Sequence, residues 1–143
     1  MTTARWTGVG AAAAAVALLL FPVLRPWPDE AVASTALATA FASERWVVSH
    51  LCGILGLGLL APTMLGLRSV LWLPARSTAT AALATAWAGA GLCALYFGLE
   101  TFGIRTVAQA ALRTGDLTLL AEADTLAAGL VLVARTVARL YPA

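Results

Sequence analysis

The chain has 143 residues, of which 61% are hydrophobic and only 11% are charged, and its formal net charge is +2 at pH 7. Soluble domains usually carry about 25% charged residues, so this composition argues against a large soluble core. All nine basic residues are arginines scattered along the chain, whereas a nucleic-acid surface needs a clustered basic stripe. The composition therefore favours a protein of the lipid bilayer and excludes a nucleic-acid partner.

The first long apolar run covers residues 7–24 and follows Arg5 and Trp6. As an α-helix it would rise about 27 Å, close to the thickness of the hydrocarbon layer of a bilayer. The tripeptide AVA at residues 31–33 is similar to a signal-peptidase site. However, the apolar run is long for a signal peptide and ends in Arg-Pro-Trp-Pro, so we expect an uncleaved membrane span.

Residues 29–45 are less apolar and contain many alanine, serine and threonine residues. Asp29 is a candidate N-cap, because a carboxylate complements the positive end of a helix dipole. Val32, Leu37 and Phe41 would share one side of such a helix. The pattern fits either a helix at the membrane interface or a solvated connector, and the sequence leaves both open.

Two further apolar runs, residues 46–67 and 80–104, are each long enough to span a bilayer. The connector between them is short, which predicts an antiparallel helical hairpin. If the chain turns near residues 72–74, position 50 faces roughly position 96.

The C-terminal part is harder to assign. Gly115-Asp116 predicts a turn, and the segment 117–134 has the length of a span only if it includes Glu122 and Asp124. Whether it crosses the membrane or lies at its surface stays open, as does whether the chain is part of a longer protein. The predicted fold is an all-α, multi-pass transmembrane helical bundle over residues 1–143, a single domain with three spans and an unsettled short fourth.

The arginines predict the orientation of the bundle. With four spans, five of the nine arginines share the side of the N-terminus and four lie on the other side. Because loops rich in arginine stay in the cytoplasm, we expect a protein of the cell membrane with a cytoplasmic N-terminus.

Three residues form the candidate intramembrane polar site: His50, Glu100 and Tyr96. His50 is the sole histidine of the chain, and Glu100 is the one acid in the third apolar run. The hairpin would place both at similar depth, with Tyr96 one helical turn from Glu100. Ionisable groups inside a span are costly and usually face the bundle interior, so a His–Glu hydrogen bond would lower that cost and could handle protons.

A structural interpretation stands beside this functional one. His50 and Glu100 each lie within about one turn of the expected interface, and Arg105 is close enough in sequence to neutralise Glu100. Cys52 and Cys93 fit small buried apolar residues, and no cysteine–histidine spacing predicts a metal site. No cofactor is predicted. The glycines inside the spans are expected to let helices approach closely; they are Gly53, Gly56, Gly58, Gly66, Gly89, Gly91 and Gly98.

The pattern Trp46…His50…Gly53 in FASERWVVSHLCGILGLGLLAPTMLGLRSVL and Gly91…Gly98-Leu-Glu100 in AGAGLCALYFGLETFG resembles a loose group of uncharacterised multi-pass membrane proteins from GC-rich bacteria. In that group such segments are early spans of a longer helical bundle. The resemblance implies a helical fold and a membrane address but no activity. The ending AAGLVLVARTVARLYPA departs from the pattern, because Arg135 and Arg139 interrupt the expected span.

Three functions are compatible with the sequence. The leading one is a small non-enzymatic membrane protein, a structural or accessory bundle that associates with itself or with a membrane partner through its glycine faces. The second is a transporter-like module in which His50 and Glu100 relay protons or contact a solute. The third is a membrane enzyme, or a haem or quinone protein, that uses His50.

Overall fold

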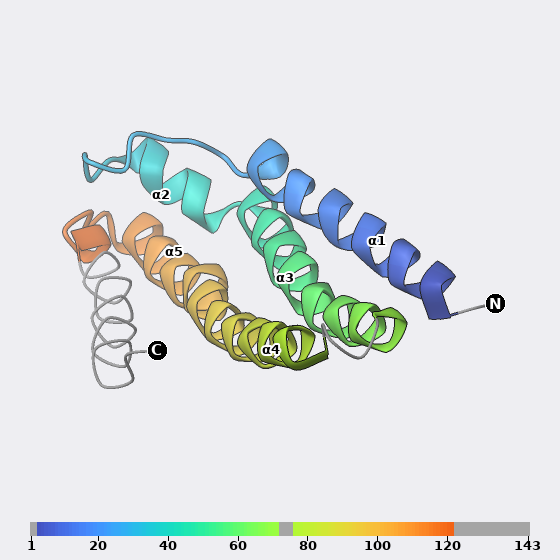
Figure 1. The fold of residues 1–143 in the computed structure, drawn as a ribbon. Helices are drawn as coiled ribbons and strands as arrows, with labels where there is room; N and C mark the ends of the chain where they lie inside the picture. The colour runs from blue at the N-terminus through green and yellow to red at the C-terminus, as the bar shows by residue number, and fades with distance from the viewer. Residues whose placement is uncertain (1–2, 72–75, 122–143) are drawn as a thin grey trace, which may run out of the picture. The chain divides into compact units, whose positions relative to one another are not determined.

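The computed structural model describes residues 3–71 and 76–121 of the chain (Figure 1). These residues form helices and connecting loops, and no β-strand occurs among them. The all-α fold predicted from the sequence is confirmed. In chain order, the elements are α1 (Thr3–Leu24), α2 (Thr35–Ala42), α3 (Glu44–Val70), α4 (Arg76–Gly98), the π-helical turn η2 (Leu99–Ile104) and α5 (Arg105–Thr114).

Three helical stretches are long and apolar enough to cross a membrane: Thr3–Leu24, Glu44–Val70 and Ser77–Thr114. They contain the predicted spans 7–24, 46–67 and 80–104, so three helices of spanning length are confirmed. The last of them is one continuous helical stretch made of α4, η2 and α5. Most of the predicted fourth segment, 117–134, lies outside the described residues, which end at residue 121.

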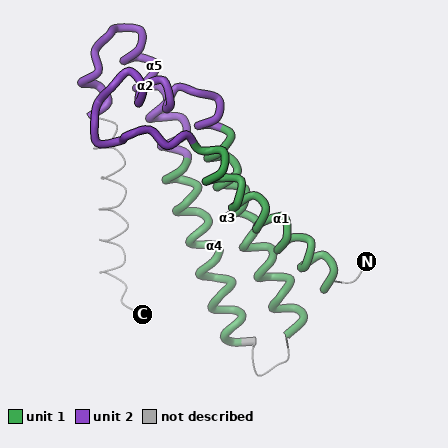
Figure 2. The backbone as a smooth tube through the Cα atoms, turned by 90° about the horizontal axis from the view of Figure 1, so that it is seen from above, with its two compact units in different colours: residues 1–25, 48–97 green, residues 26–47, 98–143 purple. Residues whose placement is uncertain are grey.

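The chain packs as two compact units that are interleaved in sequence (Figure 2). Unit 1 contains Met1–Arg25 and Val48–Phe97, and unit 2 contains Pro26–Val47 and Gly98–Ala143. Unit 1 therefore holds α1 and most of α3 and α4, whereas α2, η2 and α5 belong to unit 2. The single domain that the sequence predicts over 1–143 stays a prediction.

Glycines allow α1 and α3 to lie in direct backbone-level contact within unit 1. A Cβ atom built on Gly56 would lie 2.7 Å from Cγ of Leu18, and one built on Gly10 would lie 2.9 Å from Oγ1 of Thr63. Real Cβ atoms do not tolerate such distances, so only glycine fits at these two crossings. The contacting pairs Gly10–Thr63, Gly56–Leu18 and Gly66–Thr7 run in opposite directions along the chain, so α1 and α3 are antiparallel.

The second and third long helices form the predicted antiparallel hairpin. Arg68 near the end of α3 donates from Nε to Oγ1 of Thr80 near the start of α4, at 2.8 Å. At the other end of the pair, the rings of His50 and Phe97 lie 5.6 Å apart between centroids. The predicted register, in which position 50 faces roughly position 96, is therefore confirmed to within one residue.

Not every glycine in the long helices makes a close contact within the described chain. Gly53 is in contact with the Phe21 and Phe97 rings, and Gly56 and Gly66 pack on α1. In contrast, a Cβ on Gly58, Gly89, Gly91 or Gly98 would meet nothing within 4 Å. Among the described residues these four glycines make no close helix contact, so for them the expectation of close helix approach stays a prediction.

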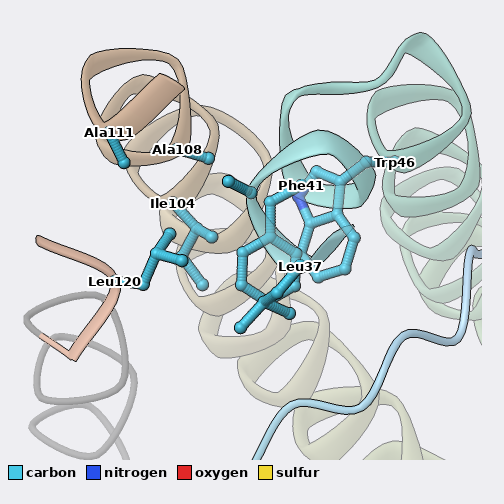
Figure 3. Packing of buried hydrophobic residues seen from close by; sticks show 8 residues of the cluster. Leu37, Phe41, Trp46, Ile104, Ala108, Ala111 and Leu120 are labelled. Atoms are coloured by element: carbon cyan, nitrogen blue, oxygen red, sulfur yellow. The ribbon is translucent and has the colours of Figure 1, made fainter. Parts of the chain in front are cut away.

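Unit 2 has its own apolar cluster, built where α2 packs on α5 (Figure 3). Ala38 of α2 and Ala108 and Ala111 of α5 are fully buried, and these small side chains let the two short helices approach. The rings of Phe41 and Trp46 lie against each other with centroids 4.5 Å apart. The remaining buried members are Leu37, Ile104 and Leu120.

The cap of α2 differs from the one that the sequence predicts. Ser34 is the N-cap: it has extended backbone angles, and its Oγ accepts a hydrogen bond from the Leu37 amide at 3.1 Å. Asp29 instead closes a local turn by accepting from the Ala31 amide at 3.0 Å. Val32 consequently lies outside the helix and is exposed, whereas Leu37 and Phe41 are buried as expected. The predicted break at Gly115 is confirmed, because this glycine ends α5 with a φ of 76°.

The glycine crossing predicts opposite effects for two neighbouring substitutions on α3. We expect Gly56→Ala to destabilise the protein by about 1–3 kcal/mol, because the new methyl group collides with Leu18. Gly58→Ala is the matched control: it adds the same atom in open space and should stabilise the helix by up to about 1 kcal/mol. Thermal unfolding of the purified proteins measures both, and equal unfolding temperatures would contradict the crossing.

Asp116 provides a prediction about ionisation. Hydrogen bonds from the Thr118 hydroxyl and the Thr118 amide favour the carboxylate and lower the pKa of Asp116 below its ordinary value. A lowered folded-state pKa contributes stability at neutral pH that is lost as the pH falls through that pKa. We expect Thr118→Val to raise the pKa of Asp116, as followed by carboxyl NMR, and Thr106→Val on α5 to leave it unchanged.

Candidate functional site

His50 lies in a fully buried, mainly aromatic environment inside unit 1. Its ring makes edge-on contacts with Phe21 of α1, at a centroid distance of 5.3 Å, and with Phe97 of α4, at 5.6 Å. These two phenyl rings also contact each other at 5.1 Å. Each ring comes from a different long helix, so His50 lies where α1, α3 and α4 meet.

A polar neighbour accompanies the His50 ring. Ser49 is also fully buried, and its Oγ lies 3.2 Å from Nδ1 of His50, within hydrogen-bonding distance. Because a buried imidazole without a polar partner is costly, a hydrogen bond with Ser49 would lower the cost of burying the ring. Ser49 and His50 thus form a small polar pair inside an aromatic shell.

Tyr96 belongs to the same unit as His50 and is partly buried. Its ring packs edge-on against Phe97 with centroids 5.6 Å apart. Phe97, which contacts both Tyr96 and His50, is therefore the ring between these two predicted site residues. The structure gathers His50 and Tyr96 around Phe97.

Glu100 lies in unit 2, in the π-helical turn η2, and is partly buried. Its backbone carbonyl accepts a hydrogen bond from Nε1 of Trp46 at 2.9 Å. Thr101, the next residue, is fully buried. Since His50 and Glu100 belong to different units, the predicted His50–Glu100 pair stays a prediction.

Arg105 has an acidic partner that lies far from it in sequence. It forms an ion pair with Glu44 at the start of α3, so it links α5 to the first turn of that helix. Glu44 also occupies the first turn of α3, where a carboxylate complements the helix dipole. The expected neutralisation of Glu100 by Arg105 stays a prediction, because the ion pair with Glu44 does not test it.

The sequence alone did not reveal the rings that surround His50. Phe21 and Phe97 are ordinary members of apolar runs, and no spacing rule distinguishes them from lipid-facing side chains. Once the antiparallel register is known, both can be found by pairing residues across the helices. Nothing in the sequence indicated that the indole of Trp46 makes a hydrogen bond across 54 positions of sequence.

The remaining candidate chemistry is limited. Among residues 3–71 and 76–121, no group of three or more histidine, cysteine, aspartate or glutamate side chains is arranged to hold a metal ion. Cys52 and Cys93 are both partly buried free thiols rather than fully buried residues. Cys52 borders an apolar groove of about 520 Å³ whose other walls come from α1 and Leu55.

Comparisons with known proteins give no match: no protein-family model, no curated protein and no solved structure matches this chain. The class of protein that the fold defines is thus a helical bundle with three helices of membrane-spanning length. The resemblance to multi-pass proteins of GC-rich bacteria stays an expectation.

The aromatic environment predicts how His50 substitutions behave. We expect His50→Ala to destabilise the protein by about 2–4 kcal/mol, because it leaves a cavity beside Phe21 and Phe97. His50→Phe retains a ring and should cost less, although it removes the hydrogen bond with Ser49. Leu51→Ala, on the exposed side of the same helix, is the control with little expected effect. Thermal unfolding ranks the three variants, and equal losses for Ala at positions 50 and 51 would contradict the burial of His50.

Proposed function

We propose that this chain is an integral protein of the cell membrane that acts as a non-enzymatic structural or accessory component. The observation that carries this proposal is the burial of His50. The sole histidine of the chain packs against two phenyl rings from the neighbouring helices and lies within hydrogen-bonding distance of Ser49, so its contacts help to hold these helices together. A substrate would have to displace that packing before it reached the imidazole.

The outer surface of unit 1 supports the membrane part of the proposal. Large apolar side chains are exposed on α1, α3 and α4, including Leu19, Leu55 and Leu95. Water would penalise this surface, whereas lipid tails accept it without cost. Arginine placement supports a cytoplasmic N-terminus.

The open side of α4 supports an accessory role. Gly91 has nothing within 4 Å of its Cβ position, and Trp87 and Leu95, one helical turn before and after it on the same side of α4, are more than half exposed. Small residues on a helix in lipid allow another helix to approach closely. We therefore expect the chain to associate through α4 with another copy of itself. If a different membrane protein binds there instead, the experiment below will show its mass.

Native mass spectrometry of the protein, gently extracted from its membrane, tests this proposal. We expect subunits of about 14.7 kDa in an oligomer, with Gly91→Leu reducing the oligomer and Gly58→Leu, on the open side of α3, leaving it intact. A monomer in both variants and in the parent would contradict the accessory role. A bound haem or quinone would instead favour a redox protein that uses His50.

A second function, proton or solute transfer through His50 and Glu100, is favoured by one observation. Glu100 lies in a π-helical turn, and such turns are rare and often found at functional sites. An acidic side chain in a helix of spanning length is itself a marker of transport. Tyr96, one turn earlier on α4, would complete the polar path.

Proton flux in vesicles that contain the reconstituted protein distinguishes the two functions. If the chain is a transfer module, Glu100→Gln should abolish a flux that Glu30→Gln, in the loop before α2, retains. The structural proposal expects no protein-dependent flux in the parent or in either variant. A flux that is lost only in Glu100→Gln would therefore replace the first function by the second.

A further inference from the structure

The π-helical turn η2 interrupts an α-helical stretch that otherwise runs from Arg76 to Thr114. In a π turn each amide bonds five residues back instead of four, so the turn accommodates one extra residue in the helix. Such turns are uncommon, because the wider coil bonds and packs less well than an α-helix. A stable π turn therefore needs a contact from outside the helix that favours it.

Trp46 supplies that contact from the first turns of α3. Its indole Nε1 donates to the carbonyl oxygen of Glu100, the second residue of η2, at 2.9 Å. The indole is almost fully buried and packs against Phe41 with ring centroids 4.5 Å apart (Figure 3). This packing restricts the ring and so keeps the N–H donor close to the Glu100 carbonyl.

The position of this hydrogen bond in the chain adds to its importance. The chain passes between the two compact units three times, at residues 25/26, 47/48 and 97/98. The second and third of these boundaries lie inside helical stretches. Trp46 lies just before the boundary at 47/48, and Glu100 lies just after the boundary at 97/98. The indole hydrogen bond therefore joins the two helical segments of unit 2 that begin or end at these boundaries.

We propose that Trp46 is a positioning residue that holds residues 99–104 in the π-helical register through its indole N–H. All the contacts involved lie inside unit 2, so this inference does not rest on the function proposed above.

The register of η2 sets the orientation of α5. Adding or removing one residue in a helix rotates every later residue by about 100° about the helix axis. The π turn thus determines that Ala108 and Ala111 face α2, where Ala38 meets them. Trp46 controls this orientation through one hydrogen bond.

Hydrogen exchange of the full-length protein in lipid nanodiscs tests the proposal. Trp46→Phe keeps an aromatic ring but deletes the N–H donor, and we expect the amides of residues 99–108 to exchange roughly three- to tenfold faster. Trp87→Phe is the matched control, because it makes the same chemical change at a ring that is 58% exposed on α4. Exchange at 99–108 should stay at the parent rate in this control.

A one-residue deletion separates the role of the donor from general packing. Gly103 lies in η2, and a Cβ there would contact only Leu99 of the same turn, at 3.6 Å. Removing Gly103 takes out the extra residue, so an α-helical turn forms without help from the indole. We therefore expect the deletion to restore slow exchange at 99–108 in the Trp46→Phe protein.

Two results would overturn the proposal: parent-like exchange at 99–108 in Trp46→Phe, or no recovery when Gly103 is also deleted. If Trp46→Phe does not fold, the indole proton of the parent protein decides the question by NMR. Slow exchange of the Trp46 indole proton, matching the amides of η2, supports the hydrogen bond. Exchange as fast as that of the Trp87 indole overturns it.

Discussion

The close approach of α1 to α3 is the constraint on which unit 1 depends. Gly10, Gly56 and Gly66 remove the Cβ atoms that would keep these helices apart. That approach brings Phe21 of α1 against the His50 ring. The contact energy of any one pair is small, but a close crossing adds dispersion contacts along the whole interface. The aromatic shell of His50 is therefore a consequence of backbone proximity as much as of ring chemistry.

The features that hydropathy and chain length determine could be predicted from the sequence. The long helices result from apolar runs of spanning length, and the hairpin results from the short connector between residues 67 and 80. A hairpin with a known turn has only one register, so the meeting of His50 with position 97 is also determined. The helices depend on the local hydropathy pattern, and the hairpin and its register depend on chain connectivity. None of these features requires knowledge of side-chain packing.

The features that depend on contacts between distant segments could not be predicted. Nothing in the residues 99–104 marks a π turn, because the donor that favours it is the Trp46 indole, which lies far away in sequence. Arg105 has Glu100 close by in sequence, yet its partner is Glu44. Of the candidate site, the sequence predicted that position 50 lies across from about position 96, but not the phenyl rings that contact His50.

The described residues expose far more large apolar side chains than a water-soluble protein would. Ser49, His50, Thr63 and Thr101 are buried, while many leucines and valines of α1, α3 and α4 are exposed. The Thr63 hydroxyl donates to the Leu59 carbonyl at 2.7 Å and so meets its hydrogen-bonding need within its own helix. In water this arrangement would lose the hydrophobic free energy of the exposed side chains. In lipid it is the exposure of polar groups that costs free energy, and burying these groups among hydrogen-bond partners inside the bundle avoids that cost. The same sequence therefore has a reason to adopt this fold in a bilayer that it lacks in water, which supports the membrane assignment independently of helix length.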